Sequence, residues 1–183
     1  MERPVLLALW LPIVLSTIAL FFASFLSWVV LPLHKLDWVQ LRGEDELLKT
    51  ARAIGLAPGS YMFPAAASPD ERKSPEHQEK WKQGPRGIMT VFGEVNMGAN
   101  LALTVVYFLA TSFVIAYLAT IALKPGAESL TVFRFFSTAG LLTYLSAIVQ
   151  HSIWFRCRIT GHVIESIAYA AILGGIFASL WPK

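Results

Sequence analysis

Five ionisable residues stand at the borders of long apolar segments, where they could hold a metal ion or relay protons. If each segment crosses a membrane, all five emerge on the same side: His34, Glu94, His151, His162 and Glu165. Because His162 and Glu165 are three residues apart, a helix places them on one face, at a spacing that could chelate a metal or pass a proton. Two histidines and two carboxylates at one end of a helix bundle would suit zinc, manganese or iron. Glu165 is the first to test, since a carboxylate inside a membrane span is costly.

A plainer interpretation of these residues is that they share no function. Histidines are common at the water interface of membrane helices, and the helix dipole favours a glutamate in a first turn. No pair has the spacing of an established ligand motif, and the sequence does not fix how the helices are rotated. We therefore expect no catalytic residue and no bound cofactor, with a divalent metal at these residues as the alternative.

Other chemical signals in the sequence are weak. No phosphate-binding Gly-x-x-x-x-Gly-Lys-Ser/Thr loop, Gly-x-Ser-x-Gly elbow or His-Glu-x-x-His helix is present. Haem held by two histidines is disfavoured because every histidine lies at or beyond a predicted interface. The single cysteine, Cys157, lies between two arginines that would favour its thiolate, but an isolated cysteine is more often incidental.

The composition indicates a membrane protein. Of 183 residues, 55% are hydrophobic and 15% are charged, whereas about 25% are charged in soluble domains. A spanning helix needs roughly 20 apolar residues, and four segments meet this length, at 4–32, 95–123, 130–154 and 163–181. We predict an all-α integral membrane protein, a bundle of four transmembrane helices that forms a single membrane domain over 1–183.

The polar connector at 34–94 is predicted to fold, with two short helices. One follows Gly43, where acidic residues begin and a glycine closes an amphipathic stretch, and the other begins at Ser74-Pro75 and ends before Gly84-Pro85. Such start and stop signals, together with Tyr61, Phe63 and Trp81, are not typical of a disordered linker. We interpret these three aromatic residues as candidate contacts with a partner.

Charge distribution predicts the orientation. Only Arg3, Lys124, Arg134 and Lys183 among the lysines and arginines lie on the side opposite the connector. The positive-inside rule then places the connector in the cytoplasm and both termini outside. The net charge of +3 is spread among acids without a basic stripe, so no nucleic-acid partner is expected.

Small residues recur every fourth position in the last span. One row contains Gly174 and the next contains Gly175, and such rows let helix backbones approach closely. Packing within the bundle is the favoured interpretation, and contact with a second protein or a second copy is the alternative. A polar row of Asn96, Asn100 and Thr104 on the second span is interpreted as a hydrogen-bonded stripe that faces neighbouring helices, with a transport path as the alternative.

Several motifs resemble those of a family of small bacterial four-span inner-membrane proteins. They are 59-GSYMFP-64, 74-SPE-76, 80-KWKQGP-85, 152-SIW-154 and 180-LWP-182. The resemblance implies a bacterial inner-membrane protein and assigns no activity or catalytic residue. Because the sequence has no reaction motif but has a connector with aromatic anchors, we expect a non-enzymatic accessory, assembly or structural subunit. It would dock on a larger membrane complex through the connector and the small-residue helix faces. The alternative is a small transporter or metal-dependent membrane enzyme working at the His/Glu cluster.

Overall fold

The computed structural model describes residues 6–183. Four of its helices are long and apolar enough to cross a membrane: Leu6–Val30, Met97–Ala122, Ser129–Phe155 and Thr160–Leu180. They confirm the predicted all-α bundle of four helices. Their ends lie within a few residues of the predicted ones, apart from the predicted start at residue 4, which falls outside the described residues.

The first span changes its helix type along its length. A 3-10 turn at Leu6–Leu9 leads into α1 (Trp10–Phe25), which is followed by a π-helical turn at Leu26–Val30 and a 3-10 turn at Pro32–His34. The N–H of Leu31 closes the π turn on the carbonyl of Leu26 at 2.8 Å. Leu31 itself is extended, as expected for a residue before proline. This irregular end carries Trp28 and His34 into the site described below.

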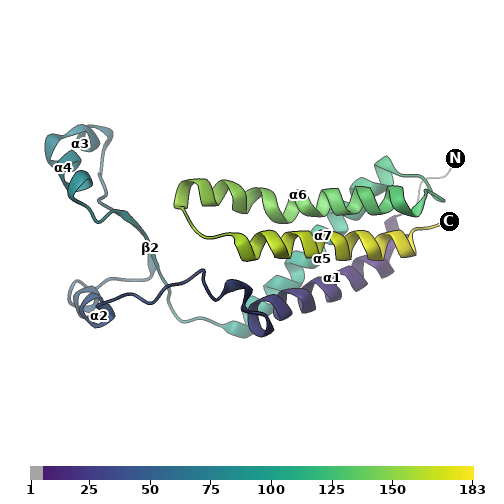
Figure 1. The fold of residues 1–183 in the computed structure, drawn as a ribbon, viewed down its shortest axis with the longest axis horizontal. Helices are drawn as coiled ribbons and strands as arrows, with labels where there is room; N and C mark the ends of the chain where they lie inside the picture. The colour runs from purple at the N-terminus through teal and green to yellow at the C-terminus, as the bar shows by residue number, and fades with distance from the viewer. Residues whose placement is uncertain (1–5) are drawn as a thin grey trace. The chain divides into compact units, whose positions relative to one another are not determined.

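The bundle core lies between α1, α5 (Met97–Ala122), α6 (Ser129–Phe155) and α7 (Thr160–Leu180) (Figure 1). Apolar side chains from all four helices fill it, and the rings of Phe136 and Phe177 stack with centroids 3.9 Å apart. At one end, the indole N–H of Trp181 donates to the carbonyl of Lys124 at 2.9 Å. This bond ties the end of α7 to the turn between α5 and α6.

Glycines let α6 and α7 approach each other closely. A Cβ at Gly174 would lie 2.9 Å from Cδ2 of Phe133, and one at Gly140 would lie 3.3 Å from Cα of Ala170. Gly175, in contrast, has nothing within 4 Å of such a Cβ. The small-residue row through Gly174 therefore packs inside the bundle, while the row through Gly175 does not.

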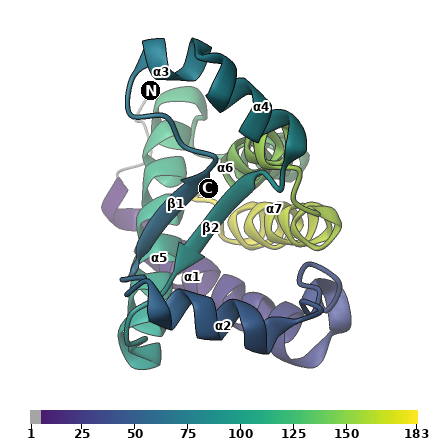
Figure 2. The ribbon, with the colours of Figure 1, turned by 90° about the vertical axis from the view of Figure 1, so that its left-hand side faces the viewer.

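The chain forms two compact units, one made of the bundle with its flanking residues to Val39 and the other of Gln40–Asn96. The second unit contains α2 (Glu44–Ala53), β1 (Gly59–Phe63), α3 (Pro69–Lys73), α4 (Pro75–Gln83) and β2 (Gly87–Val91). Figure 2 shows β1 beside β2, and they pair antiparallel with Tyr61 opposite Met89. The predicted helices correspond to α2 and α4, whereas the strands and α3 were not predicted. The organisation as a single domain stays a prediction.

Serine caps position the two adjacent helices of this second unit. The side-chain oxygen of Ser68 accepts from the N–H of Glu71, and that of Ser74 accepts from the N–H of His77, both at 3.1 Å. A proline follows each serine at the first helical position, where its missing N–H costs nothing. Gly84, with φ of +65°, ends α4.

Candidate metal centre

Three of the five residues predicted as ligands meet at one end of the bundle. Ligand atoms of His34, His162 and Glu165 all lie within 4.8 Å of one another. His34 comes from the 3-10 turn after the first span, and the other two come from the first turns of α7. His151 lies outside this group, exposed and beside the ring of Phe155. Glu94 is an exposed residue of the second unit and is not part of the group.

The imidazole of His34 is buried and held on two sides. It stacks on the indole of Trp28 with centroids 3.9 Å apart and planes 7° apart. On α7, Gly161 leaves the space that the ring occupies, because a Cβ there would lie 2.7 Å from Cε1 of His34. With His34 only 5% exposed, these contacts fix the plane of the ring.

Asp37 determines which ring nitrogen of His34 carries a hydrogen atom. The Nδ1–H of His34 donates to a carboxylate oxygen of Asp37 at 2.6 Å. In the neutral imidazole the other nitrogen, Nε2, is then an acceptor. Nε2 is buried without a hydrogen-bond partner in the part of the chain that the structure describes, and it lies 3.3 Å from Oε1 of Glu165. Two acceptors this close repel each other unless a proton or a metal ion lies between them.

The carboxylate of Glu165 is held in place from within α7. Its Oε1 accepts from the hydroxyl of Tyr169 at 3.1 Å, one helical turn further along. Its Oε2 lies 3.6 Å from Nδ1 of His162, the more exposed of the two histidines. Glu165 thus directs one oxygen toward each imidazole.

The charges around the site favour a cation. Asp37 and Glu165 are both buried, and the guanidinium of Arg158 lies 3.9 Å from Asp37. Two carboxylates and two imidazoles thus lie around one arginine side chain. A buried charge needs a partner, and a divalent ion would supply it.

One separation between ligand atoms matches the spacing expected around a tetrahedral metal. Ligands at about 2.1 Å from zinc are about 3.4 Å from one another. The 3.3 Å between Nε2 of His34 and Oε1 of Glu165 is close to that value. Nδ1 of His162 lies 3.6 Å from the other carboxylate oxygen, Oε2, and with one ligand atom taken from each residue the three atoms lie within 4.8 Å of one another.

A cavity of about 380 Å³ adjoins the site on the side of the first span. It is lined by the single stretch from Trp28 to Trp38, and His34 belongs to its lining. The wall is apolar except for His34 and Lys35. Neither His162 nor Glu165 belongs to its lining.

Several residues of the site were missed by sequence reasoning. Asp37 is three residues after His34, a spacing that could have suggested their pairing. Tyr169 follows Glu165 by four residues, which is a helical neighbour position. Nothing in the sequence marks Trp28 and Gly161 as the residues against which His34 packs.

The residues predicted as partner contacts lie in different environments. The hydroxyl of Tyr61 donates to the carbonyl of Ala57 at 2.8 Å. Phe63 and Trp81 are 38% and 44% exposed. Gly174 is buried against α6, and Gly175 faces open space. Of the five, only Gly174 is buried within the chain, and Tyr61 and Gly175 are both partly exposed.

Comparison with known proteins adds no further information. No protein-family model, no curated protein and no solved structure matches this chain.

Proposed function

We propose that this chain is a metal-dependent membrane enzyme whose divalent transition-metal ion is bound by His34, His162 and Glu165. One observation carries the proposal. The buried Nε2 of His34 has no hydrogen-bond partner among residues 6–183, yet it faces a carboxylate at 3.3 Å. A metal ion between the two would satisfy both atoms.

The surroundings of His34 support this assignment. Histidines that bind metals usually donate their other ring N–H to a carboxylate or carbonyl, which fixes the tautomer and makes the ligand more basic. Asp37 is in that position. Two histidines and one carboxylate form the donor set of catalytic zinc sites and of non-haem iron sites.

The number of ligands favours catalysis over a structural role. Structural zinc sites are closed by four protein ligands, whereas catalytic sites use three and leave a position for water. Zinc lowers the pKa of such a water to about 7 and so generates a nucleophile. The cavity beside His34 supplies space for an amphipathic substrate at the end of the first span.

Metal analysis of the purified full-length protein tests the proposal. Protein supplied with zinc, manganese or iron(II) should retain close to one ion per chain, and His34→Ala, His162→Ala and Glu165→Gln should each lose it. His151→Ala and Glu94→Gln are matched controls and should keep the metal. Metal-free wild-type protein, or equal retention in all five variants, would refute the assignment.

A second candidate function is that of an accessory, assembly or structural subunit of a larger membrane complex. The exposed Phe63 and Trp81 in the second unit and the open position at Gly175 favour it. Such a subunit should co-purify with a partner from native membranes in mild detergent, and Trp81→Ala should weaken that association. A protein that migrates alone under these conditions contradicts this function.

We further propose a location in the bacterial inner membrane, with the connector in the cytoplasm and both termini outside. The resemblance to small bacterial four-span proteins supports the first part, and the distribution of lysine and arginine supports the second. The bilayer is then the main partner, in addition to a protein partner or a second copy, and no nucleic acid is expected.

A further inference from the structure

The second unit contains a cavity that the proposed metal chemistry does not use. Its volume is about 510 Å³, and its lining comes from β1, the chain after it, α3 and α4. Met62 and Pro64 form part of an apolar wall. Arg72, His77, Trp81 and Lys82 contribute the polar and aromatic part.

The cations of this cavity are available to a ligand. Among the described residues, no carboxylate forms an ion pair with Arg72 or Lys82, and none lines the cavity. Three of the acids on the same helices have partners outside the cavity. Glu71 accepts from the N–H of Ala67 at 2.7 Å, Glu76 pairs with Lys80 at 2.7 Å, and Glu79 accepts from Gln83 at 3.1 Å.

His77 adds a buried polar group to the same wall. It is 8% exposed, and its ring nitrogens have no hydrogen-bond partner within residues 6–183. The imidazole lies beside the indole of Trp81, with centroids 6.4 Å apart. Its ring nitrogens are not among the fully buried unpaired atoms of the described chain, so they remain accessible and can donate a hydrogen bond to a bound anion.

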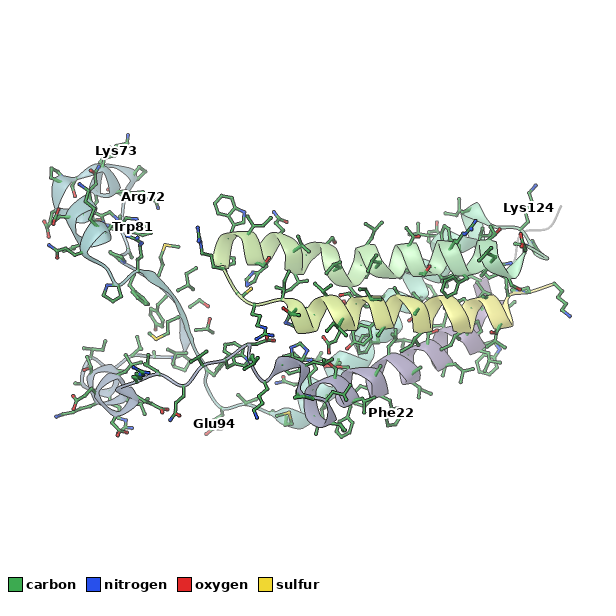
Figure 3. The ribbon with its side chains drawn as sticks, viewed as in Figure 1. Phe22, Arg72, Lys73, Trp81, Glu94 and Lys124 are labelled. Atoms are coloured by element: carbon green, nitrogen blue, oxygen red, sulfur yellow. The ribbon has the colours of Figure 1, made fainter. Side chains whose placement is uncertain are left out.

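We propose that this cavity binds a small anion that carries an apolar or aromatic body, such as a phosphate monoester. The phosphate would lie between Arg72 and Lys82, and its body would lie against Trp81 and the apolar wall. Figure 3 shows Arg72 on α3 and Trp81 on α4, the two helices that bracket the cavity. The caps at Ser68 and Ser74 hold these helices in the required position.

Calorimetric titration of phenyl phosphate into the full-length protein in phosphatidylcholine nanodiscs tests the site. Arg72→Gln and Lys82→Gln should each weaken binding about tenfold, the usual loss for one charge-assisted hydrogen bond. Lys73→Gln is the matched control, because Lys73 is next to Arg72 but does not line the cavity. It should bind like the wild type. Trp81→Leu should reduce the preference for phenyl phosphate over inorganic phosphate.

The source of the anion is distinguished by a second titration, in nanodiscs that contain phosphatidylglycerol. If a lipid headgroup occupies the cavity, phenyl phosphate should bind more weakly there, and the difference should disappear in Arg72→Gln. An unchanged affinity indicates a soluble ligand. Absence of saturable binding to the wild type, or an equal loss in Lys73→Gln, would overturn the proposal.

Discussion

Gly161 and His34 pack so closely that no larger residue fits at position 161. A Cβ there would lie 2.7 Å from Cε1 and 2.9 Å from Nδ1 of the imidazole. The ring cannot move away easily, because its other face is stacked on Trp28. The first turn of α7 therefore helps to decide where the Nε2 of His34 lies.

Gly161→Ala should weaken metal binding without removing any ligand. The added methyl group displaces His34 from Glu165, and we expect metal affinity to fall by about tenfold or more, as for loss of a supporting contact around a metal. Competition with a zinc chelator measures the affinity. Gly175→Ala, where nothing lies within 4 Å, is the control. Wild-type affinity in Gly161→Ala would argue against His34 as a ligand.

Asp37→Asn should reduce metal affinity by about 10- to 100-fold, the usual effect of losing a supporting carboxylate. The neutral amide accepts the Nδ1–H of His34 less strongly than the carboxylate and leaves Arg158 without its counter-charge. The same chelator competition applies, with Asp45→Asn, an exposed acid of α2, as the control. Equal effects of the two substitutions would mean that overall charge, rather than the orientation of His34, sets the affinity.

Gly174→Ala should destabilise the bundle, and Gly175→Ala should not. The first substitution places a methyl group 2.9 Å from the Phe133 ring and 3.0 Å from its carbonyl oxygen, and such overpacking costs about 1 to 3 kcal/mol. The second replaces glycine by a better helix former in open space. Thermal unfolding in detergent compares the two variants. A similar melting temperature for both would contradict the observed packing of α6 against α7.

The ion pair between Glu76 and Lys80 should shift the pKa values of its two members in opposite directions. A hydrogen bond and the charge of Lys80 lower the pKa of Glu76 below 4.5, and Glu76 in turn raises the pKa of Lys80 above 10.5. The ion pair therefore makes its full contribution to stability between pH 4.5 and pH 10.5. It is lost as pH falls through the lowered pKa of Glu76 or rises through the raised pKa of Lys80.

Carboxyl chemical shifts followed against pH measure the titration of Glu76. Because both groups are fully exposed, we expect little effect on the stability of the protein. Lys80→Met should return the pKa of Glu76 to its ordinary value. No difference between wild type and Lys80→Met would show that the ion pair does not form in solution.

Labelling of Cys157 tests the predicted orientation. This cysteine is exposed and lies between α6 and α7, on the side of the connector. A membrane-impermeant maleimide should react with it only after the cells are permeabilised. Lys183→Cys in a Cys157→Ser background should react in intact cells. The reverse pattern would place the connector outside.

Much of the fold could be predicted from the sequence because its signals are local. Four long apolar stretches must cover their backbone polar groups with helical hydrogen bonds in a membrane. The caps at Ser68 and Ser74 are also local, since each serine oxygen binds an N–H three residues ahead. The pairing of β1 with β2 was not predictable in this way, because it joins segments separated by two helices.

The sequence alone determined that this chain has four apolar spans with ionisable residues at their ends. Only the tertiary structure decided which of these residues meet, because helix rotation and the irregular end of the first span are set by packing. His34, His162 and Glu165 come together, since Gly161 admits the imidazole and Trp28 covers it. His151, on the exposed side of α6, lies outside the group although it belongs to the same end of the bundle.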